Sequence, residues 1–146
     1  PGGRNKMTND LQPHQKAMLD TATSTGYGLW SGVECREVGD GVGRITFKPR
    51  AEMLTPWGTL NGGVVTSLVE IPSFISLLTT LKDDELPVTN DIFLQHMRPL
   101  PGDCVYEMVG KLIRRGKSMA WTDVAVIANG ATVSIARITK TIAKKG

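Results

Sequence analysis

Residues 60–70 read Leu-Asn-Gly-Gly-Val-Val-Thr-Ser-Leu-Val-Glu, and this stretch decides how the chain folds. The glycine pair, Gly62 and Gly63, precedes a long apolar segment in which residues 64–81 contain a single charged side chain, Glu70. Such a segment predicts a helix that is apolar on nearly every face and needs cover on every side. We therefore expect a curved sheet wrapped around one long central helix, in an α+β domain.

The same stretch contains groups that suit acyl transfer. A helix that begins at the glycine pair leaves its first N–H groups without partners inside the helix, and such donors bind anions or a developing oxyanion. Because Gly62 has no Cβ, a ligand can approach its backbone closely. Glu70 lies about two turns further along. Oxyanion donors and a carboxylate on one rigid element are the parts that acyl transfer to water requires.

Both features also have a simpler interpretation, which the sequence leaves open. The glycine pair can be only a tight turn into a helix. Glu70 can lie on a solvent-exposed face, although an ionised carboxylate within an apolar helix is costly unless a partner neutralises it. By length the segment could span a membrane, but Glu70, Pro72 and six Ser or Thr residues favour the core helix of a soluble protein.

The rest of the chain predicts one short helix and several strands. Pro72 removes a helical hydrogen bond and should kink the central helix just past Glu70. The Asp40-Gly41 and Asn129-Gly130 pairs predict hairpin turns, and the last four strands form an antiparallel meander. The expected elements are a helix over 9–22, capped by Asn9 or Asp10 and ended by Gly26 and Gly28, strands over 33–38 and 42–47, a loop over 49–57, the central helix from 62 to about 81, a charged turn over 82–87, and strands over 88–97, 104–113, 119–128 and 131–142.

Length and composition limit the possible classes of function. The 146 residues suffice for a single domain with its own core, divided into an N-terminal lead and helix (1–28) and a main domain (29–146), with residues 1–6 as a disordered polar lead. A net charge of +3 without interleaved aromatic and basic residues does not favour nucleic-acid binding. Cys35 and Cys104 lack metal-ligand spacing, so we expect free thiols and no metal. The polar N-terminus lacks a signal core, which indicates a cytoplasmic protein.

Several spaced motifs resemble the hotdog-fold thioesterases, most closely the branch that includes phenylacetyl-CoA and 4-hydroxybenzoyl-CoA thioesterases. The first is Gly58-Thr59-Leu60-Asn61-Gly62-Gly63 followed by Glu70. The second runs from Thr89-Asn90-Asp91-Ile92-Phe93-Leu94 through Arg98-Pro99 to Gly102-Asp103, and the third is Arg114-Arg115-Gly116-Lys117-Ser118-Met119-Ala120. The resemblance covers roughly residues 29–142 and implies the hotdog fold, an antiparallel sheet wrapped around a central helix.

The resemblance also implies roles for four residues. Gly62 matches the glycine whose N–H polarises the thioester carbonyl, and Glu70 matches the acid that attacks the carbonyl or activates a water. Asn61 stands where His is usual, and Thr55 stands where Asn or Gln often orients the water or the carbonyl. Asn can donate a hydrogen bond but does not titrate as His does, and Thr is short enough to need a bridging water.

Family members are typically dimers or tetramers whose site lies at the subunit interface, with Gly62 and Glu70 supplied by opposite subunits. Coenzyme A enters as part of the substrate, and no separate cofactor is implied. The cations of the basic turn 114–118 suit the phosphates of coenzyme A, although a solvated charge run explains them equally. Trp57 and Phe74 are core residues or acyl-pocket residues, and His96 and Arg98 line the site or face solvent. The predicted substrate-binding residues are Gly63, Trp57, Ser73, Phe74, Asn90, Arg114, Arg115, Gly116, Lys117 and Ser118.

Together these observations predict an acyl-CoA thioesterase in which Glu70 acts as base or nucleophile and Gly62 as oxyanion donor. Asn61 and Thr55 leave an alternative open, a non-catalytic acyl-CoA-binding or regulatory hotdog protein. A hydratase or dehydratase on the same fold is disfavoured because the Asp-then-His pair of such enzymes is absent.

Overall fold

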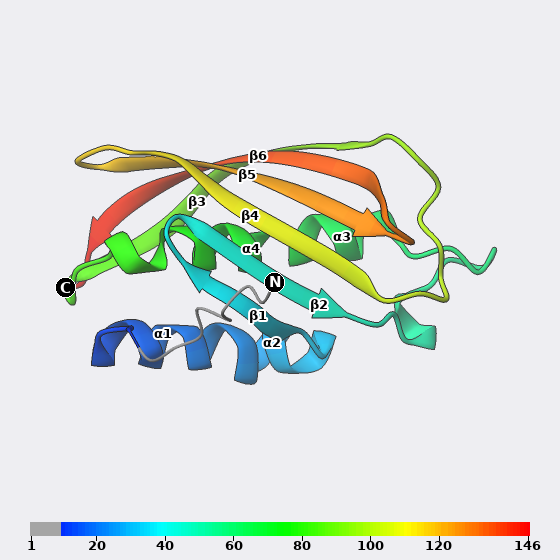
Figure 1. Ribbon diagram of the computed structural model, residues 1–146, viewed down its shortest axis with the longest axis horizontal. Helices are drawn as coiled ribbons and strands as arrows, with labels where there is room; N and C mark the ends of the chain where they lie inside the picture. The colour runs from blue at the N-terminus through cyan, green and yellow to red at the C-terminus, as the bar shows by residue number, and fades with distance from the viewer. Residues whose placement is uncertain (1–9) are drawn as a thin grey trace, which may run out of the picture.

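The computed structural model describes residues 10–146, so the predicted polar lead and the predicted cap Asn9 lie outside the described residues. In chain order (Figure 1) the elements are α1 (Pro13–Ser24), α2 (Gly26–Ser31), β1 (Glu34–Gly39), β2 (Val42–Phe47), the 3-10 turn η1 (Ala51–Met53), α3 (Gly62–Leu68), α4 (Glu70–Leu77), the 3-10 turn η2 (Leu78–Thr80), β3 (Glu85–His96), β4 (Tyr106–Arg115), β5 (Met119–Ala128) and β6 (Ala131–Lys144).

The six strands form one antiparallel sheet in the order β1-β2-β4-β5-β6-β3. Figure 1 shows this sheet curving over α3 and α4, so the predicted architecture of a sheet around one long helix is confirmed. The predicted meander is wrong in one place, because β3 pairs with β6 and not with β4. Residues 97–105 are too long for a hairpin and carry the chain across the sheet. As a result β1 and β3 are the two edge strands.

The central helix is interrupted at Val69, between α3 and α4. Pro72 is the cause, since it has no N–H to donate to the Leu68 carbonyl. The sequence predicted a kink just past Glu70, whereas the helix is interrupted just before that residue. Glu70 therefore begins a new helical segment.

Two glycines set how closely α4 approaches the sheet. Gly43 and Gly110 are direct partners across β2 and β4, and both face the carbonyl of Pro72. A Cβ on Gly43 would lie 2.6 Å from that oxygen, and a Cβ on Gly110 would overlap it. The absence of both side chains lets the kinked helix rest directly on the strands, which fixes the depth at which Glu70 lies.

The first helix is shifted relative to its prediction. It is capped by Gln12 and ends at Ser24, while Gly26, predicted to help end it, begins the separate helix α2 with a φ of 49°. The predicted charged turn over 82–87 is also partly wrong, because β3 already begins at Glu85. Both predicted hairpin turns are confirmed, with Asp40 and Asn129 at φ values of 51° and 50°.

The helical stretch Gly62–Thr80 is long and apolar enough to cross a membrane by length and composition alone. More than half of it is buried inside the protein, and Val65, Leu68 and Ile75 have no exposed surface. This burial is typical of the core helix of a soluble fold and agrees with the core helix expected from the sequence.

Candidate functional site

Glu70, the first residue of α4, has two partners on the sheet. Its Oε2 accepts a hydrogen bond from Thr89 Oγ1 at 2.7 Å and lies 2.6 Å from Lys140 Nζ. Lys140 Nζ also donates to Thr89 Oγ1 at 2.7 Å, and the two residues are direct cross-strand partners on β3 and β6. The Lys140 side chain is only 3% exposed. The carboxylate that appears isolated in the sequence is thus neutralised by a buried ammonium.

The second carboxylate oxygen of Glu70, Oε1, has no hydrogen-bond partner among residues 10–146. The Glu70 side chain is 31% exposed, and it lines a hollow of about 510 Å³ together with Thr89, Lys140 and residues of the α1–α2 junction. One oxygen is therefore held in place while the other is left without a partner among the described residues, in a side chain that lines a space large enough for a substrate. This arrangement suits a carboxylate that must act on a bound molecule.

Sequence reasoning missed Lys140, although a signal was present. Along β6 the positions that face the helix are Ala136, Ile138, Lys140 and Ile142, all of them buried. A lysine at a position where the alternation requires an apolar residue indicates a buried charge with a specific partner. The lone Glu70 was the natural candidate for that partner.

Gly62 is the first residue of α3, and its neighbours on both sides are used to start the helix. Asn61 is the N-cap, and its Oδ1 accepts the N–H of Gly63 at 2.7 Å. The N–H of Gly62 has no acceptor among the residues that the structure describes. Asn61 therefore consumes one donor of the glycine pair and leaves the other available.

His96, at the end of β3, lies beside Gly62. Its Nδ1 is 2.8 Å from Oγ of the buried Ser134, and a Cβ on Gly62 would come within 2.8 Å of its Nε2. The glycine thus leaves room for the imidazole ring. The sequence left open whether His96 lines the site or faces solvent. The structure shows both, because His96 is exposed and its ring lies beside Gly62.

Three other predicted site residues have local roles. Thr55 closes its own loop, with Oγ1 2.8 Å from Thr59 Oγ1. Asn90 forms a bulge in β3, and its Oδ1 accepts a hydrogen bond from Thr141 at 3.0 Å. The prediction that Ser73 binds substrate is corrected, because its side chain is fully buried and lies 2.6 Å from Thr122 Oγ1.

Of the two aromatic candidates, only Phe74 lies in the wall of the Glu70 hollow. Trp57 is 86% exposed, so the interpretation of this residue as part of the core is wrong. Trp57 lies in the loop before α3 and does not pack against the apolar interior.

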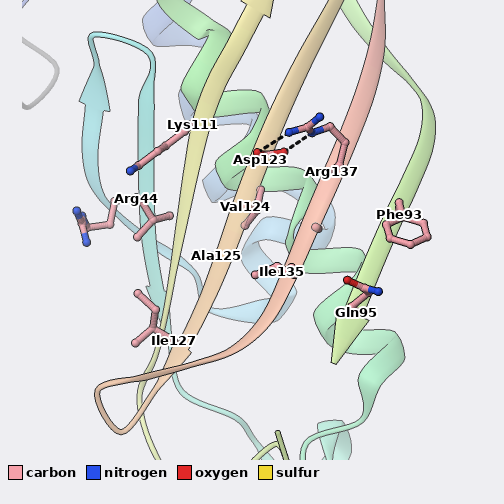
Figure 2. Close-up of a pocket in the computed structure, with 12 residues that line it drawn as sticks. Arg44, Phe93, Gln95, Lys111, Asp123, Val124, Ala125, Ile127, Ile135 and Arg137 are labelled. Atoms are coloured by element: carbon pink, nitrogen blue, oxygen red, sulfur yellow. Dashed lines mark hydrogen bonds and ion pairs between the residues drawn. The ribbon is translucent and has the colours of Figure 1, made fainter. Parts of the chain in front are cut away.

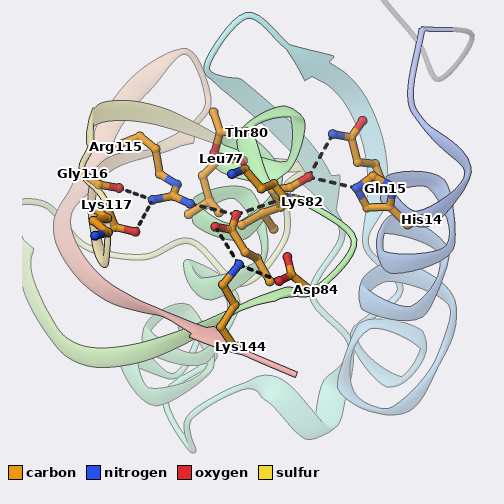
Figure 3. Close-up of polar contacts among 12 residues, drawn as sticks. His14, Gln15, Leu77, Thr80, Lys82, Asp84, Arg115, Gly116, Lys117 and Lys144 are labelled. Atoms are coloured by element: carbon orange, nitrogen blue, oxygen red, sulfur yellow. Dashed lines mark hydrogen bonds and ion pairs between the residues drawn. The ribbon is translucent and has the colours of Figure 1, made fainter. Parts of the chain in front are cut away.

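The basic turn is held together by Arg115. Its guanidinium lies 2.8 Å from the buried carboxylate of Glu85 and donates to the carbonyls of Gly116 and Lys117 (Figure 3). The pKa of Glu85 lies below its ordinary value, mainly because the Lys82 N–H donates to its carboxylate and also because Arg115 does, against the opposing effect of burial. Arg115 is therefore occupied inside the protein, whereas Arg114, Lys117 and Ser118 are exposed.

Another hollow lies on the sheet face away from α3 and α4 (Figure 2). It measures about 580 Å³, has Phe93 and Ile135 among its apolar residues, and carries the Asp123–Arg137 ion pair. It contains none of the predicted site residues. The chemistry is concentrated around the smaller Glu70 hollow and the start of α3.

A sequence profile of the Thioesterase superfamily matches residues 58–135, which is more than half of the chain and includes both Gly62 and Glu70. The chain belongs to the thioesterase superfamily. A search of curated protein sequences gives no significant match to this chain.

Solved structures share its hotdog fold at low sequence identity. The mutant thioesterase PA1618 of Pseudomonas aeruginosa superposes with a TM-score of 0.79 and 21% identity over 98% of this chain and 100% of its own. Thioesterase HI1161 of Haemophilus influenzae superposes with a TM-score of 0.76 and 20% identity, over 95% of this chain and 94% of its own. The Escherichia coli PaaI protein from the phenylacetic acid degradation operon superposes with a TM-score of 0.74 and 17% identity, over 88% of this chain and 92% of its own. These likenesses establish the fold of this thioesterase-superfamily protein.

Proposed function

We propose that this protein is an acyl-CoA thioesterase in which Glu70 is the catalytic carboxylate. The observation that carries the proposal is the asymmetry of the Glu70 carboxylate: Oε2 is fixed by Lys140 and Thr89, and Oε1 has no partner among residues 10–146 in a side chain that lines the hollow. Membership of the thioesterase superfamily supplies the reaction class.

In the general-base form of the reaction, Glu70 Oε1 takes a proton from a water molecule as the water oxygen adds to the thioester carbonyl carbon. The tetrahedral intermediate then collapses, the C–S bond breaks, and the thiolate of coenzyme A takes up the proton that Glu70 accepted, which restores the carboxylate. In the nucleophilic form, Oε1 itself adds to the carbonyl carbon, and the C–S bond breaks to release the thiolate of coenzyme A. Water then hydrolyses the resulting anhydride, which gives the free acid and restores the Glu70 carboxylate. In both forms Lys140 holds the carboxylate in position.

The Gly62 N–H is the proposed donor to the developing oxyanion. His96 can supply a second hydrogen bond to the same oxygen. When Ser134 donates its hydroxyl proton to His96 Nδ1, the ring proton is on Nε2, which is the atom that faces Gly62. The imidazole then compensates for the histidine that Asn61 replaces.

One chain cannot bring both halves of this site to one thioester. Gly62 and Glu70 are eight residues apart on the same helical stretch, which is about 12 Å at 1.5 Å per residue. A homodimer or larger assembly in which Gly62 of one subunit faces Glu70 of another removes this difficulty. Strand β3 offers a suitable edge, with unpaired backbone groups and the exposed side chains of Leu86, Val88 and Phe93.

A non-catalytic acyl-CoA-binding protein is the second candidate function. The Glu70–Lys140 ion pair favours this candidate, because an acid with a purely structural role makes the same kind of ion pair. The same hollow would then hold an acyl-CoA without cleaving it.

The two functions are separated by incubating the purified protein with acyl-CoAs from acetyl to long-chain and aryl, with release of free thiol as the readout. We expect catalytic thiol release for at least one acyl class, at many turnovers per subunit. Stoichiometric binding of acyl-CoA without thiol release across the whole panel would contradict the thioesterase proposal and support the binding protein.

A further inference from the structure

The Glu70 hollow adjoins a second hollow along α1, which we call the α1 groove. The α1 groove also measures about 510 Å³. The two spaces share three residues, Thr21, Ala22 and Phe74, so their walls are continuous. The α1 groove is lined by His14, Ala17, Met18, Thr21, Ala22, Phe74, Asp83, Leu86 and Lys145.

The groove runs parallel to α1 and away from Glu70. Ala22, Met18 and His14 are spaced four residues apart, so they lie on one face of the helix and cover about 12 Å of its length. On the opposite wall, Phe74 stands one turn after Glu70 on the same face of α4, and Leu86 belongs to the edge strand β3. The path therefore leads from the Glu70 carboxylate to the far end of α1.

The groove is mostly apolar near Glu70, where Thr21 is its one polar lining residue and donates its hydroxyl to the Ala17 carbonyl, and it carries ionisable side chains at its distal end. The wall beside Glu70 is formed by Ala22, Met18 and Phe74, and Ala17 adds a further small side chain. At the far end His14 is hydrogen-bonded to the Leu81 carbonyl and Lys145 to the Asp83 carbonyl. Small alanines leave space, and methionine adapts its shape to a flexible ligand.

We propose that the α1 groove holds the acyl tail of the thioester and that the substrates are therefore medium- or long-chain acyl-CoAs. This inference rests on the proposed function. The groove adjoins the hollow lined by the carboxylate that would act on the thioester carbon, so an extended alkyl chain that passes from one space into the other is the occupant that this arrangement favours. Each methylene moved from water into the groove improves binding by up to about fourfold.

Two alanines on α1 allow a graded test. Ala22 lines both spaces, so Ala22→Phe blocks the path where it leaves Glu70, whereas Ala17 lines only the α1 groove, and Ala17→Phe blocks it further out. Lys16 is exposed and lines neither space, and Lys16→Phe is the matched control on the same helix. The ligands are alkyl-CoA thioethers from S-ethyl to S-dodecyl, whose binding is measured by calorimetry and needs no turnover.

We expect the affinity of the native protein to rise with chain length. Ala17→Phe, which does not line the Glu70 hollow, should bind S-ethyl-CoA normally and lose the gain only for the longer chains. Ala22→Phe should lose the gain at every length, and Lys16→Phe should keep the native profile. An equal loss at every chain length in Ala17→Phe, or an unchanged profile in both alanine variants, would overturn the proposal. If this pattern holds but the corresponding thioesters are not hydrolysed, the groove stands and the thioesterase function fails.

Discussion

Lys140 Nζ lies 2.6 Å from Glu70 Oε2, although the two residues are 70 positions apart and belong to a strand and a helix. The lysine is almost fully buried and the carboxylate only partly, so the ammonium anchors the acid from inside. Thr89 completes the contact by bonding both groups. This three-residue cluster explains how an acidic side chain is accommodated in an otherwise apolar helix.

Lys140→Met should impair turnover more than substrate binding, because Glu70 would lose the group that fixes its Oε2. Misplacement of a catalytic group by about 1 Å can cost on the order of 100-fold in rate, so we expect a loss of that size in kcat with KM nearly unchanged. Thr89→Val, which removes only one of the two donors, should cost less. The control is Lys144→Met, an exposed ion-paired lysine on the same strand. A Lys140→Met enzyme with native kcat, or one altered only in KM, would contradict the positioning role.

The Gly62 N–H can be removed without losing the helix. Gly62 is the first helical residue, where proline is well tolerated, and Asn61 has the extended backbone that precedes a proline comfortably. Gly62→Pro should therefore fold and lose about 100- to 1,000-fold in kcat. Gly62→Ala places a comparable Cβ against His96 but keeps the N–H, and it should retain much more activity. Equal losses in the two variants would assign the effect to crowding of His96.

The shared site can be tested with the same variant. If Gly62 and Glu70 act from opposite subunits, mixing inactive Gly62→Pro and Glu70→Ala chains should restore activity in heterodimers, which carry one intact site each. Random reassociation would recover up to about a quarter of native activity. If native mass spectrometry shows heterodimers but no activity is recovered, then either both groups act within one chain or one of them is not catalytic.

The basic turn should divide into a binding part and a structural part. Replacing Arg114 and Lys117 by alanine should raise KM for acyl-CoA several-fold, with a smaller loss at high salt, because both side chains are exposed and can reach phosphate oxygens. Hydrolysis of a truncated thioester without the nucleotide should be unaffected. Arg115→Ala should instead lower the melting temperature, since it removes the cation closest to the buried carboxylate of Glu85. Equal losses on both substrates would contradict phosphate binding.

Glu85 should make folding stability depend on acidity. Because its pKa in the folded protein lies below the ordinary value of 4.5, the carboxylate stabilises the fold above that pH, and this contribution disappears as the pH falls through the lowered pKa. Glu85→Gln should cost about 1–3 kcal/mol in unfolding free energy at pH 7 and less at a pH below the lowered pKa of Glu85. Denaturant unfolding at the two pH values measures this difference. A cost that is the same at both would show that the charge of Glu85 is unimportant.

Local patterns predicted much of the fold. Strand β5 lies at its predicted residues, 119–128, since the run of β-formers is bounded by turn residues on both sides. The hairpin turn at Asn129-Gly130 could be predicted because its two residues need a positive φ, which Asn and Gly adopt more readily than other residues. The position of β3 beyond β6 could not be predicted, because alternation of side chains shows that a strand exists but not which strand it pairs with.

The site was predicted less completely because its contacts are long-range. Gly62 and Glu70 followed from one continuous motif, and Phe74 lies on the same helix. Lys140, Ser134 and Glu85 meet their partners only after the sheet has formed, so the roles of Lys140, His96 and Arg115 depended on residues far away in the chain. Ser73 was misassigned for the same reason, since its partner Thr122 comes from β5.

The central claim, that Glu70 is the catalytic carboxylate, is tested most directly by steady-state hydrolysis of the best acyl-CoA by Glu70→Gln. The amide keeps the shape of the side chain but cannot take a proton or attack the carbonyl, so we expect kcat to fall by about 100- to 10,000-fold. Because Lys140 would then be buried without its carboxylate, the double variant Glu70→Gln/Lys140→Met serves as a charge-free control and should be equally inactive while binding alkyl-CoA thioethers. A folded Glu70→Gln enzyme that hydrolyses this substrate at the native rate would contradict the account.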